Sequence, residues 1–571
     1  MKERIYADNI KVVSFDIFDT LILRPFVKPT DLFGLIEQNE KRPGFSKARI
    51  EAERKAREKK GHGVRLNEIY EMIPDYKGLM DIECRYEIDL AILNQPILDE
   101  LLGLYEDKTI VIASDMYLPE DVLAEILSKF DIPYHKLYVS SSLGIAKHDG
   151  RMFDMILQEF SIKPEELLHI GDNKYSDVRT PRSMGILTEY HEKPIKSYLR
   201  RNADERRFYK RSGSLTSSII VSMDMVREEN QDVWWDIGER YGGPLTYSYS
   251  KFLVDHTDDS SLLLFAARDG YTLMRAVESL GLTNDSKYIY VQRLFSKVLH
   301  DEDVLKGRTI ALPSRFSDSV GYKRTMMRLK TILSFFSRDL NLEKLDDGTS
   351  LEKAYNLNRG RIAALCRKAR ADYNHTLCEL CGDRKIELVD CTTMRHSSQK
   401  LVEKTIGRGI HAHNLLILRD YDRGLSFDCL YQWPHTFIGW SRVDIPEFLL
   451  CSPELPVCGW SNGKPVFDDD APSFEKDRAQ HYPDVSDGEL KYIERMTTIF
   501  SDHLPVFDYI DVNRWVLLSA AKGTRYRNLL KDIKWASGAD HSDWAPIIPW
   551  DGMINRLKRI SIDFLSKLND D

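Results

Sequence analysis

The chain has few cysteines, no long hydrophobic run and no excess of positive charge. Its 571 residues include 8 cysteines, too few for the disulfide framework of a secreted scaffold. The longest apolar run, Leu262–Ala267, is as long as one strand and far shorter than the roughly 18 residues that cross a bilayer. The formal net charge of −8 argues against a protein that coats nucleic acid, because a phosphate backbone binds to a basic surface.

Several familiar motifs are also missing. The sequence has no Walker-type phosphate loop, no GxGxxG dinucleotide fingerprint and no GxSxG elbow, so it lacks the usual signs of an NTPase, a dinucleotide-dependent enzyme or a serine hydrolase. Residues Met1–Asn9 are polar and charged and do not resemble a secretory signal. We therefore expect a cytoplasmic protein without membrane insertion, and neither sequence nor composition indicates an oligomeric state.

The chain is too long for one hydrophobic core and predicts several domains. In the first ~195 residues, four short apolar segments alternate with helical patterns, which favours an α/β fold with a parallel sheet. The four predicted strands are Val12–Phe15, Ile110–Ala113, Leu137–Val139 and Leu167–Ile170.

The remaining boundaries follow from changes in composition. Residues 1–23 and 109–195 form the predicted core, and residues 24–108 read as a helical insertion, or cap, whose charged side chains we expect on its surface. Residues 196–230 are polar, partly basic and then serine-rich, which predicts a linker. Residues 231–571 again mix strand and helix patterns, with a last helix over 551–568, and predict a second α/β domain of unknown activity.

Polar residues follow each predicted strand of the first domain. Asp16 ends the first, Ser114 the second, Lys147 comes after the third, and Asp172 ends the fourth, with Asp177 shortly after it. The carboxyl ends of parallel strands meet at one crevice. We therefore expect two acids, a hydroxyl, an ammonium group and a further acid to converge there.

This set of groups suits phosphoryl transfer. Asp16 can attack phosphorus and form an aspartyl phosphate. The Asp16 and Asp172 carboxylates, with the main-chain carbonyl of Phe18, offer the hard oxygen ligands that Mg²⁺ prefers. Ser114 and Lys147 can stabilise the phosphoryl oxygens.

Residues 1–195 resemble the haloacid dehalogenase (HAD) superfamily of hydrolases. DIFDT around Asp16 is similar to the first motif of that superfamily, Ser114 to the second, Lys147 to the third and GDNKYSD to the fourth. The resemblance implies a Rossmann-like core with a cap that excludes water and selects the substrate. We assign Asp177 to orienting Lys147 or metal-bound water.

The sequence departs from the superfamily pattern at Phe18. Phosphatases of the superfamily usually carry a second aspartate there, which protonates the leaving group. Three explanations stay open. The leaving group needs no acid, as in an anhydride or acyl phosphate; Asp19, His148 or a cap residue supplies the proton; or the site binds a phosphorylated ligand without turning it over well. Dehalogenase-like chemistry is a further reading, but it needs no metal, and Asp172 stands where a metal ligand belongs.

A second set of polar residues lies in the carboxyl-terminal half. Arg268 and Asp269 follow a buried strand, Arg293 and Asp390 end further strand candidates, and Arg395 comes soon after. These residues could form a second site for an anionic ligand. Alternatively, Arg268 and Asp269 form an ion pair that closes a turn.

The combination of SDMYLP in the first half with an RDG loop in the second is similar to long bacterial proteins encoded in polysaccharide and lipopolysaccharide biosynthesis loci. This resemblance favours surface-glycan chemistry but identifies no reaction. Together with the HAD resemblance, it leads us to expect a Mg²⁺-dependent hydrolase or phosphotransferase acting on a small phosphorylated metabolite, such as a sugar phosphate or nucleotide-sugar intermediate. Two alternatives stay open. One is a transferase in the second half with the first half as a binding module. The other is a catalytically weak protein that binds a phosphorylated ligand.

Overall fold

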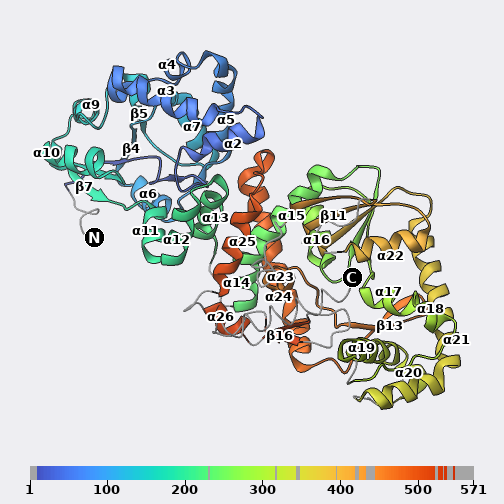
Figure 1. The fold of residues 1–571 in the computed structure, drawn as a ribbon. Helices are drawn as coiled ribbons and strands as arrows, with labels where there is room; N and C mark the ends of the chain where they lie inside the picture. Colours follow the sequence, from blue (N-terminus) through green and yellow to red (C-terminus); the bar gives the residue numbers. More distant parts are fainter. Residues whose placement is uncertain are drawn as a thin grey trace. The chain divides into compact units, whose positions relative to one another are not determined.

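The computed structural model describes most of the chain. The described residues are 9–228, 230, 232–315, 318–342, 347–393, 395–417, 424–432, 444–520, 525–531, 533–536 and 544–546. The chain forms two compact units (Figure 1). The amino-terminal unit comprises residues 1–228 and 495–511, and the second unit comprises residues 229–494 and 512–571.

The amino-terminal unit is built on a five-stranded sheet with the order β5-β4-β1-β6-β7. All neighbouring strands are parallel, and β1 is buried along its whole length, as expected for a sheet covered by helices on both faces. This confirms the predicted α/β class. The strands are β1 Val12–Phe15, β4 Thr109–Ser114, β5 Lys136–Val139, β6 Leu167–Gly171 and β7 Leu187–Tyr190.

Helices accompany this sheet and also form the insertion after β1. The insertion begins and ends at a short antiparallel ribbon in which Ile22 pairs with Leu93. Its helices are α2 Asp31–Asn39, α3 Phe45–Lys60, α4 Leu66–Tyr70 and α5 Met80–Asp89. Helix α6, Gln95–Tyr105, lies after the ribbon and packs on β4, so it accompanies the sheet. The other helices beside the sheet are α7 Glu120–Lys129, α8 Ser140–Leu143, α9 Arg151–Glu159 and α10 Thr180–Ser183.

Residues 196–230 do not form the predicted linker. The structure has three helices there: α11 Pro194–Arg201, α12 Ala203–Ser212 and α13 Leu215–Val226. One buried serine of α13, Ser218, binds polar groups of the cap. The Ser218 hydroxyl donates to Asp31 Oδ2 at 2.6 Å and accepts from the Val27 amide at 2.7 Å. A serine-rich stretch is compatible with a packed helix when its hydroxyls are satisfied in this way.

A distant segment, residues 495–511, completes the amino-terminal unit. The side-chain amide of Gln38 donates to the Val506 carbonyl at 2.9 Å and its oxygen accepts from the Val506 amide at 2.8 Å. His503 Nε2 lies 2.9 Å from Asp89 Oδ2. The cap is therefore bound to residues that follow it by more than 400 positions.

The second unit contains another five-stranded parallel sheet, with the order β12-β11-β10-β8-β9, as predicted. Its strands are β8 Leu262–Ala266, β9 Ser286–Ile289, β10 Ile386–Thr393, β11 His411–Ile417 and β12 Ser426–Gln432. Shorter antiparallel pairs are β13 Val457–Ser461 with β14 Lys464–Phe467, and β15 Lys534–Ala536 with β16 Trp544–Pro546.

Many helices belong to the carboxyl-terminal half of the chain. They are α14 Val233–Ile237, α15 Gly243–His256, α16 Gly270–Ser279, α17 Arg293–Leu299, α18 Glu302–Leu305, α19 Ser319–Phe335, α20 Ser337–Leu340, α21 Gly348–Cys381, α22 Ser397–Ile406, α23 Asp444–Leu449, α24 Ser473–Phe500, α25 Tyr509–Val516 and α26 Arg525–Leu530. Among the described residues, no helix is both long enough and apolar enough to cross a membrane. The helix predicted over 551–568 lies outside the described residues.

We expect the stability of the protein to depend on pH through one carboxyl group beside the first sheet, that of Glu100. Burial, and then the neighbouring Glu189, raise the pKa of Glu100 on α6 to about 7. A raised carboxyl pKa costs stability above that pH, because the folded protein then holds an unfavourable charge. We expect Glu100→Gln to stabilise the protein by roughly 1–2 kcal/mol at pH 8, after allowance for partial exposure. The gain should fade between pH 7 and 4.5, where the carboxyl becomes neutral.

Thermal unfolding of the parent and of Glu100→Gln at pH 5 and pH 8 would check this prediction. Glu106→Gln, at the exposed end of the same helix, is the matched control. A stabilisation by Glu100→Gln that is equal at both pH values would show that charge is not its cause.

Candidate active site

Three carboxylates meet at the carboxyl edge of the first sheet. Asp16 follows β1, Asp172 follows β6, and Asp177 lies in the π-helical turn η4, Lys174–Arg179. Each offers an oxygen within 4.8 Å of the others, and each is buried. The structure therefore brings together the three acids that we expected, from their positions at strand ends, to converge.

Lys147 lies between two of these acids. Its Nζ is 2.6 Å from Asp16 Oδ1 and 2.8 Å from Asp177 Oδ1. Asp115, which we did not single out from the sequence, fixes the loop that carries this lysine: its carboxylate accepts from the amides of Lys147 at 2.8 Å and His148 at 3.0 Å. Asp115 comes one residue after a strand end, so the same positional signal could have identified it.

Asp177 is held in place from several sides. Its Oδ2 accepts from the Asn173 amide at 2.8 Å, and its Oδ1 lies 3.2 Å from His169 Nε2. Gly171 makes room for it, since a Cβ on Gly171 would lie 2.6 Å from Asp177 Oδ2. With these partners, Asp177 can position Lys147.

The electrostatics of the cluster favour a bound cation. Burial raises the pKa of Asp16 well above its ordinary value, although Lys147 opposes this. Burial likewise raises the pKa of Asp172 to about 6. Burial also acts on Asp177, but Lys147 and His169 outweigh it and hold its pKa low. A divalent cation would allow Asp16 and Asp172 to ionise together.

The donor set fits a hard divalent ion such as Mg²⁺. Both predicted carboxylate ligands are present, and Asp172 Oδ2 is buried without a well-directed hydrogen bond among the described residues. Lys193 Nζ lies 3.2 Å from that oxygen. Carboxylate oxygens at such an edge are the ligands that Mg²⁺ takes. The third predicted ligand, the Phe18 carbonyl, stays a prediction.

Ser114 is buried at the end of β4. The strand register pairs Phe15 with Ile112, which places Ser114 about one residue beyond the level of Asp16. The hydroxyl therefore lies at the edge where the acids meet, and its role towards a phosphoryl group stays a prediction.

Phe18 stands at the position where the resemblance led us to expect an acidic residue, and its ring lies against an arginine. The Arg24 guanidinium lies 3.7 Å from the centroid of the Phe18 ring. Arg24 donates to both oxygens of Glu87 on α5, at 2.7 and 3.0 Å. A salt bridge from the cap thus covers Phe18.

Asp19, the predicted substitute proton donor, is bound to a lysine. Its backbone has a left-handed φ of 61°, and its Oδ2 lies 2.6 Å from Lys193 Nζ. Lys193 was missed because the sequence did not reveal β7, the strand that precedes it. With that strand in place, the strand-end rule would have included this lysine.

Two charged residues of the cap, Arg49 and Glu83, are not surface charges, contrary to our expectation. Arg49 is fully buried and donates to both oxygens of Glu83, each at 2.7 Å. The Tyr70 hydroxyl donates to Glu83 Oε2 at 2.8 Å. Paired and hydrogen-bonded in this way, the two charges can be buried together.

Acidic side chains lie near three residues of the second predicted site, the anion site in the carboxyl-terminal half. Arg268 Nη1 is 2.8 Å from Glu475 Oε2, rather than closing a turn with Asp269 alone. Burial, followed by Glu447 and Asp390, raises the pKa of Asp269 well above its ordinary value. Arg293 lies near Asp390 and Arg395 is exposed. The anion site in this half stays a prediction.

No family model matches the chain. A curated relative, a phosphoserine phosphatase of Thermus thermophilus, is 44% identical over 48 residues, which are 8% of this chain and 19% of the relative. The chain thus aligns with about a fifth of that relative.

The solved structures similar to this chain include a HAD family enzyme and haloacid dehalogenases. One is a HAD family enzyme of Bacteroides thetaiotaomicron in complex with magnesium and inorganic phosphate. It is 19% identical, with 32% of this chain and 95% of that chain covered and a TM-score of 0.26. Another is the L-2-haloacid dehalogenase of Xanthobacter autotrophicus, at 12% identity, 34% and 83% coverage and a TM-score of 0.26.

Proposed function

We propose that the amino-terminal unit is a Mg²⁺-dependent phosphohydrolase of the HAD type. The observation that carries the proposal is the buried cluster in which oxygens of Asp16, Asp172 and Asp177 lie within 4.8 Å of one another, with Lys147 Nζ 2.6 Å from Asp16. The short match to a phosphoserine phosphatase supports a phosphorylated compound as substrate.

In the proposed reaction, an oxygen of Asp16 attacks phosphorus and the bond to the leaving group breaks. Water then attacks the aspartyl phosphate and releases inorganic phosphate and the free Asp16 carboxylate. Lys147, held by Asp177, stabilises the negative charge on the phosphoryl oxygens. Mg²⁺ held by Asp16 and Asp172 would supply further positive charge at the same oxygens.

Phe18 narrows the proposed substrate class. Without an acid at that position, the leaving group departs as an anion, which favours acyl phosphates and phosphoanhydrides over alkyl phosphates. The diphosphate of a nucleotide sugar is such an anhydride. We propose a small phosphorylated metabolite of surface-glycan synthesis as the substrate and a cytoplasmic location for the reaction, and Phe18 favours a nucleotide-sugar intermediate over a sugar phosphate. With a nucleotide sugar, attack by Asp16 leaves a substituted phosphoryl group on the carboxylate, and water then releases it as a nucleoside or sugar monophosphate in place of inorganic phosphate.

Release of inorganic phosphate from acetyl phosphate and from a hexose phosphate, and of a nucleoside monophosphate from a nucleotide sugar, all by the full chain, would test the proposal. With Mg²⁺, we expect the acyl phosphate and the anhydride to react faster than the alkyl monoester, and chelation of Mg²⁺ by EDTA to stop all three reactions. Turnover that is equally fast in EDTA would contradict the assigned metal ligands.

Replacing Phe18 by an acid should raise the rate on poor leaving groups. General acid catalysis contributes about 10²–10⁴-fold, so we expect Phe18→Asp to accelerate hydrolysis of the hexose phosphate by at least about tenfold, and that of acetyl phosphate much less. Phe18→Asn is the control, because asparagine matches aspartate in size but carries no acidic proton. Equal rates for the two variants would mean that this position does not face the leaving group.

The alternative function is a transferase in the second unit, with the amino-terminal unit as a phospholigand-binding module. The second parallel sheet, with polar residues after β8 and β10, favours it. Asp16→Asn in the full chain separates the two functions. Glycosyl transfer that survives this change, in a protein that releases no phosphate, would assign the activity to the second unit.

A further inference from the structure

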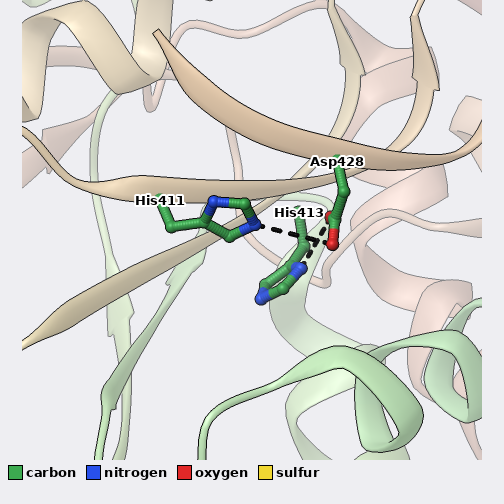
Figure 2. A group of neighbouring side chains, drawn as sticks. All are labelled: His411, His413 and Asp428. Carbon is green, nitrogen blue, oxygen red and sulfur yellow. Dashed lines mark hydrogen bonds and ion pairs between the residues drawn. The ribbon is translucent and has the colours of Figure 1, made fainter.

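Two histidines and an aspartate gather on one face of the second sheet. His411 and His413 alternate along β11, so both side chains lie on the same face. On the neighbouring strand β12, Asp428 is paired with His413 in the parallel register. Figure 2 shows both imidazoles directed towards the Asp428 carboxylate. The cluster lies near the amino ends of these strands, whereas Asp269 follows the carboxyl end of β8.

The distances suit three ligands of one ion. His413 Nδ1 lies 2.7 Å from Asp428 Oδ1, and His411 Nε2 lies 3.5 Å from Asp428 Oδ2. One atom of each residue falls within 4.8 Å of the other two. Ligands bound to zinc tetrahedrally at 2.0–2.2 Å are separated by about 3.3 Å. The separations of 2.7 Å and up to 4.8 Å lie on either side of this value, so side-chain rotations would convert these contacts into coordination.

A buried carboxylate behind the cluster fixes the orientation of His413. Glu387 Oε2 lies 2.9 Å from His413 Nε2, and Glu387 is itself held by the Ser261 hydroxyl at 2.9 Å. A proton on Nε2 shared with Glu387 leaves the Nδ1 lone pair directed at Asp428. Histidines that bind metals almost always donate their other N–H to a carboxylate or carbonyl in this manner.

We propose that His411, His413 and Asp428 bind a divalent transition-metal ion, with Zn²⁺ as the ion that two imidazoles and one carboxylate favour. Glu387 acts as a positioning residue through His413. His413 is buried, whereas His411 and Asp428 are partly exposed, so an ion can reach the site from solvent. Three protein ligands leave a fourth position for water or a substrate atom.

A metal-free ion pair is the competing explanation for the same contacts. Burial disfavours a charged His413, but its bonds to Asp428 and Glu387 outweigh this and raise its pKa to about 9. A protonated His413 between two carboxylates would need no metal. The two explanations differ in whether Zn²⁺ binds, and in whether His411, whose ring nitrogens face Ser426 and Asp428, is needed.

Metal binding by the full chain would decide between them. The protein is stripped of metal with a chelator, returned to buffer with excess Mg²⁺ to fill the site at Asp16, and titrated with Zn²⁺ by calorimetry. A parallel titration with Co²⁺ reports tetrahedral coordination through visible absorption. We expect the parent to bind Zn²⁺ at this site, His411→Ala and Asp428→Asn to weaken binding at least about 100-fold, and Glu387→Gln to weaken it about 10–100-fold.

Two further variants serve as controls. His375→Ala removes an exposed histidine on α21 and should bind Zn²⁺ like the parent. Asp172→Asn, in the other unit, should keep the same Zn²⁺ isotherm and Co²⁺ spectrum. Far-UV circular dichroism of each metal-free variant verifies that it is folded. Absence of Zn²⁺ binding in the parent, or parental affinity in folded His411→Ala and Asp428→Asn, would overturn the proposal in favour of the ion pair.

Discussion

Asp16→Asn is expected to abolish phosphate release, with a loss of about 10⁴-fold or more in kcat. The amide cannot form the aspartyl phosphate, and it also removes one of the two carboxylates proposed to hold Mg²⁺. Because Lys147 Nζ lies 2.6 Å from Asp16 Oδ1 and an amide oxygen can still accept from it, we expect the fold to persist. The measurement is phosphate release from acetyl phosphate, with circular dichroism as a check on folding.

A matched control and a second readout make the assignment of Asp16 specific. Asp149→Asn changes an aspartate of the loop that carries Lys147, where Asp149 pairs with the exposed Arg151, and should retain activity. Mass spectrometry of the parent, quenched in acid during turnover, should find a phosphoryl group on the peptide that contains Asp16. Undiminished hydrolysis by Asp16→Asn, or a phosphoryl group on another residue, would refute the nucleophile.

Arg49→Met is expected to lower the free energy of unfolding of the amino-terminal unit by about 3–5 kcal/mol. The substitution leaves the Glu83 carboxylate buried without its charged partner. Tyr70 would remain as a donor to Glu83, but one neutral hydroxyl cannot replace a bidentate guanidinium. The nine tryptophans of the chain all lie after residue 233 and outside the segment 495–511 that belongs to the amino-terminal unit. Urea unfolding followed both by circular dichroism and by tryptophan fluorescence therefore separates the two units.

Two variants test the cause of this loss. Arg54→Met removes an exposed arginine of the same helix, whose partners Glu51 and Glu58 are also exposed, and should change stability little. Replacing both members of the buried pair, Arg49→Met with Glu83→Met, should restore much of the lost stability, because no unpaired charge is left. If the double variant is less stable than Arg49→Met alone, the unpaired Glu83 is not what destabilises the cap.

The apolar runs of the sequence predicted both the first sheet and the acids at its edge. Four buried parallel strands leave apolar runs that are visible without a structure, and the crevice rule then places Asp16, Asp172 and Lys147 together. The sequence analysis did not include Lys193 in the site, because β7 is only half-buried along its length and gives a weak apolar signal. The pairing of Lys193 with Asp19 therefore depends on a strand that the pattern did not reveal.

The predictions failed where a polar side chain finds a specific partner far away in the chain. Composition treats Ser218 as a linker residue and Arg49 as a surface charge, because these residue types are mostly exposed. Their burial depends on Asp31 and Glu83, which sequence spacing does not connect to them. The histidine cluster was missed for a related reason, since Asp428 reaches His413 only through the pairing of two strands.

The discontinuous amino-terminal unit has a consequence for biosynthesis. Its first 228 residues leave the ribosome well before residues 495–511, which contain the partner of Gln38 and the histidine that contacts Asp89. At about 5–20 residues per second, the nascent cap would wait for some tens of seconds without these partners. A truncated gene product that stops near residue 228 would keep Asp16, Asp172 and Asp177 but expose the surface that the late segment covers, and we expect chaperones to bind such a fragment.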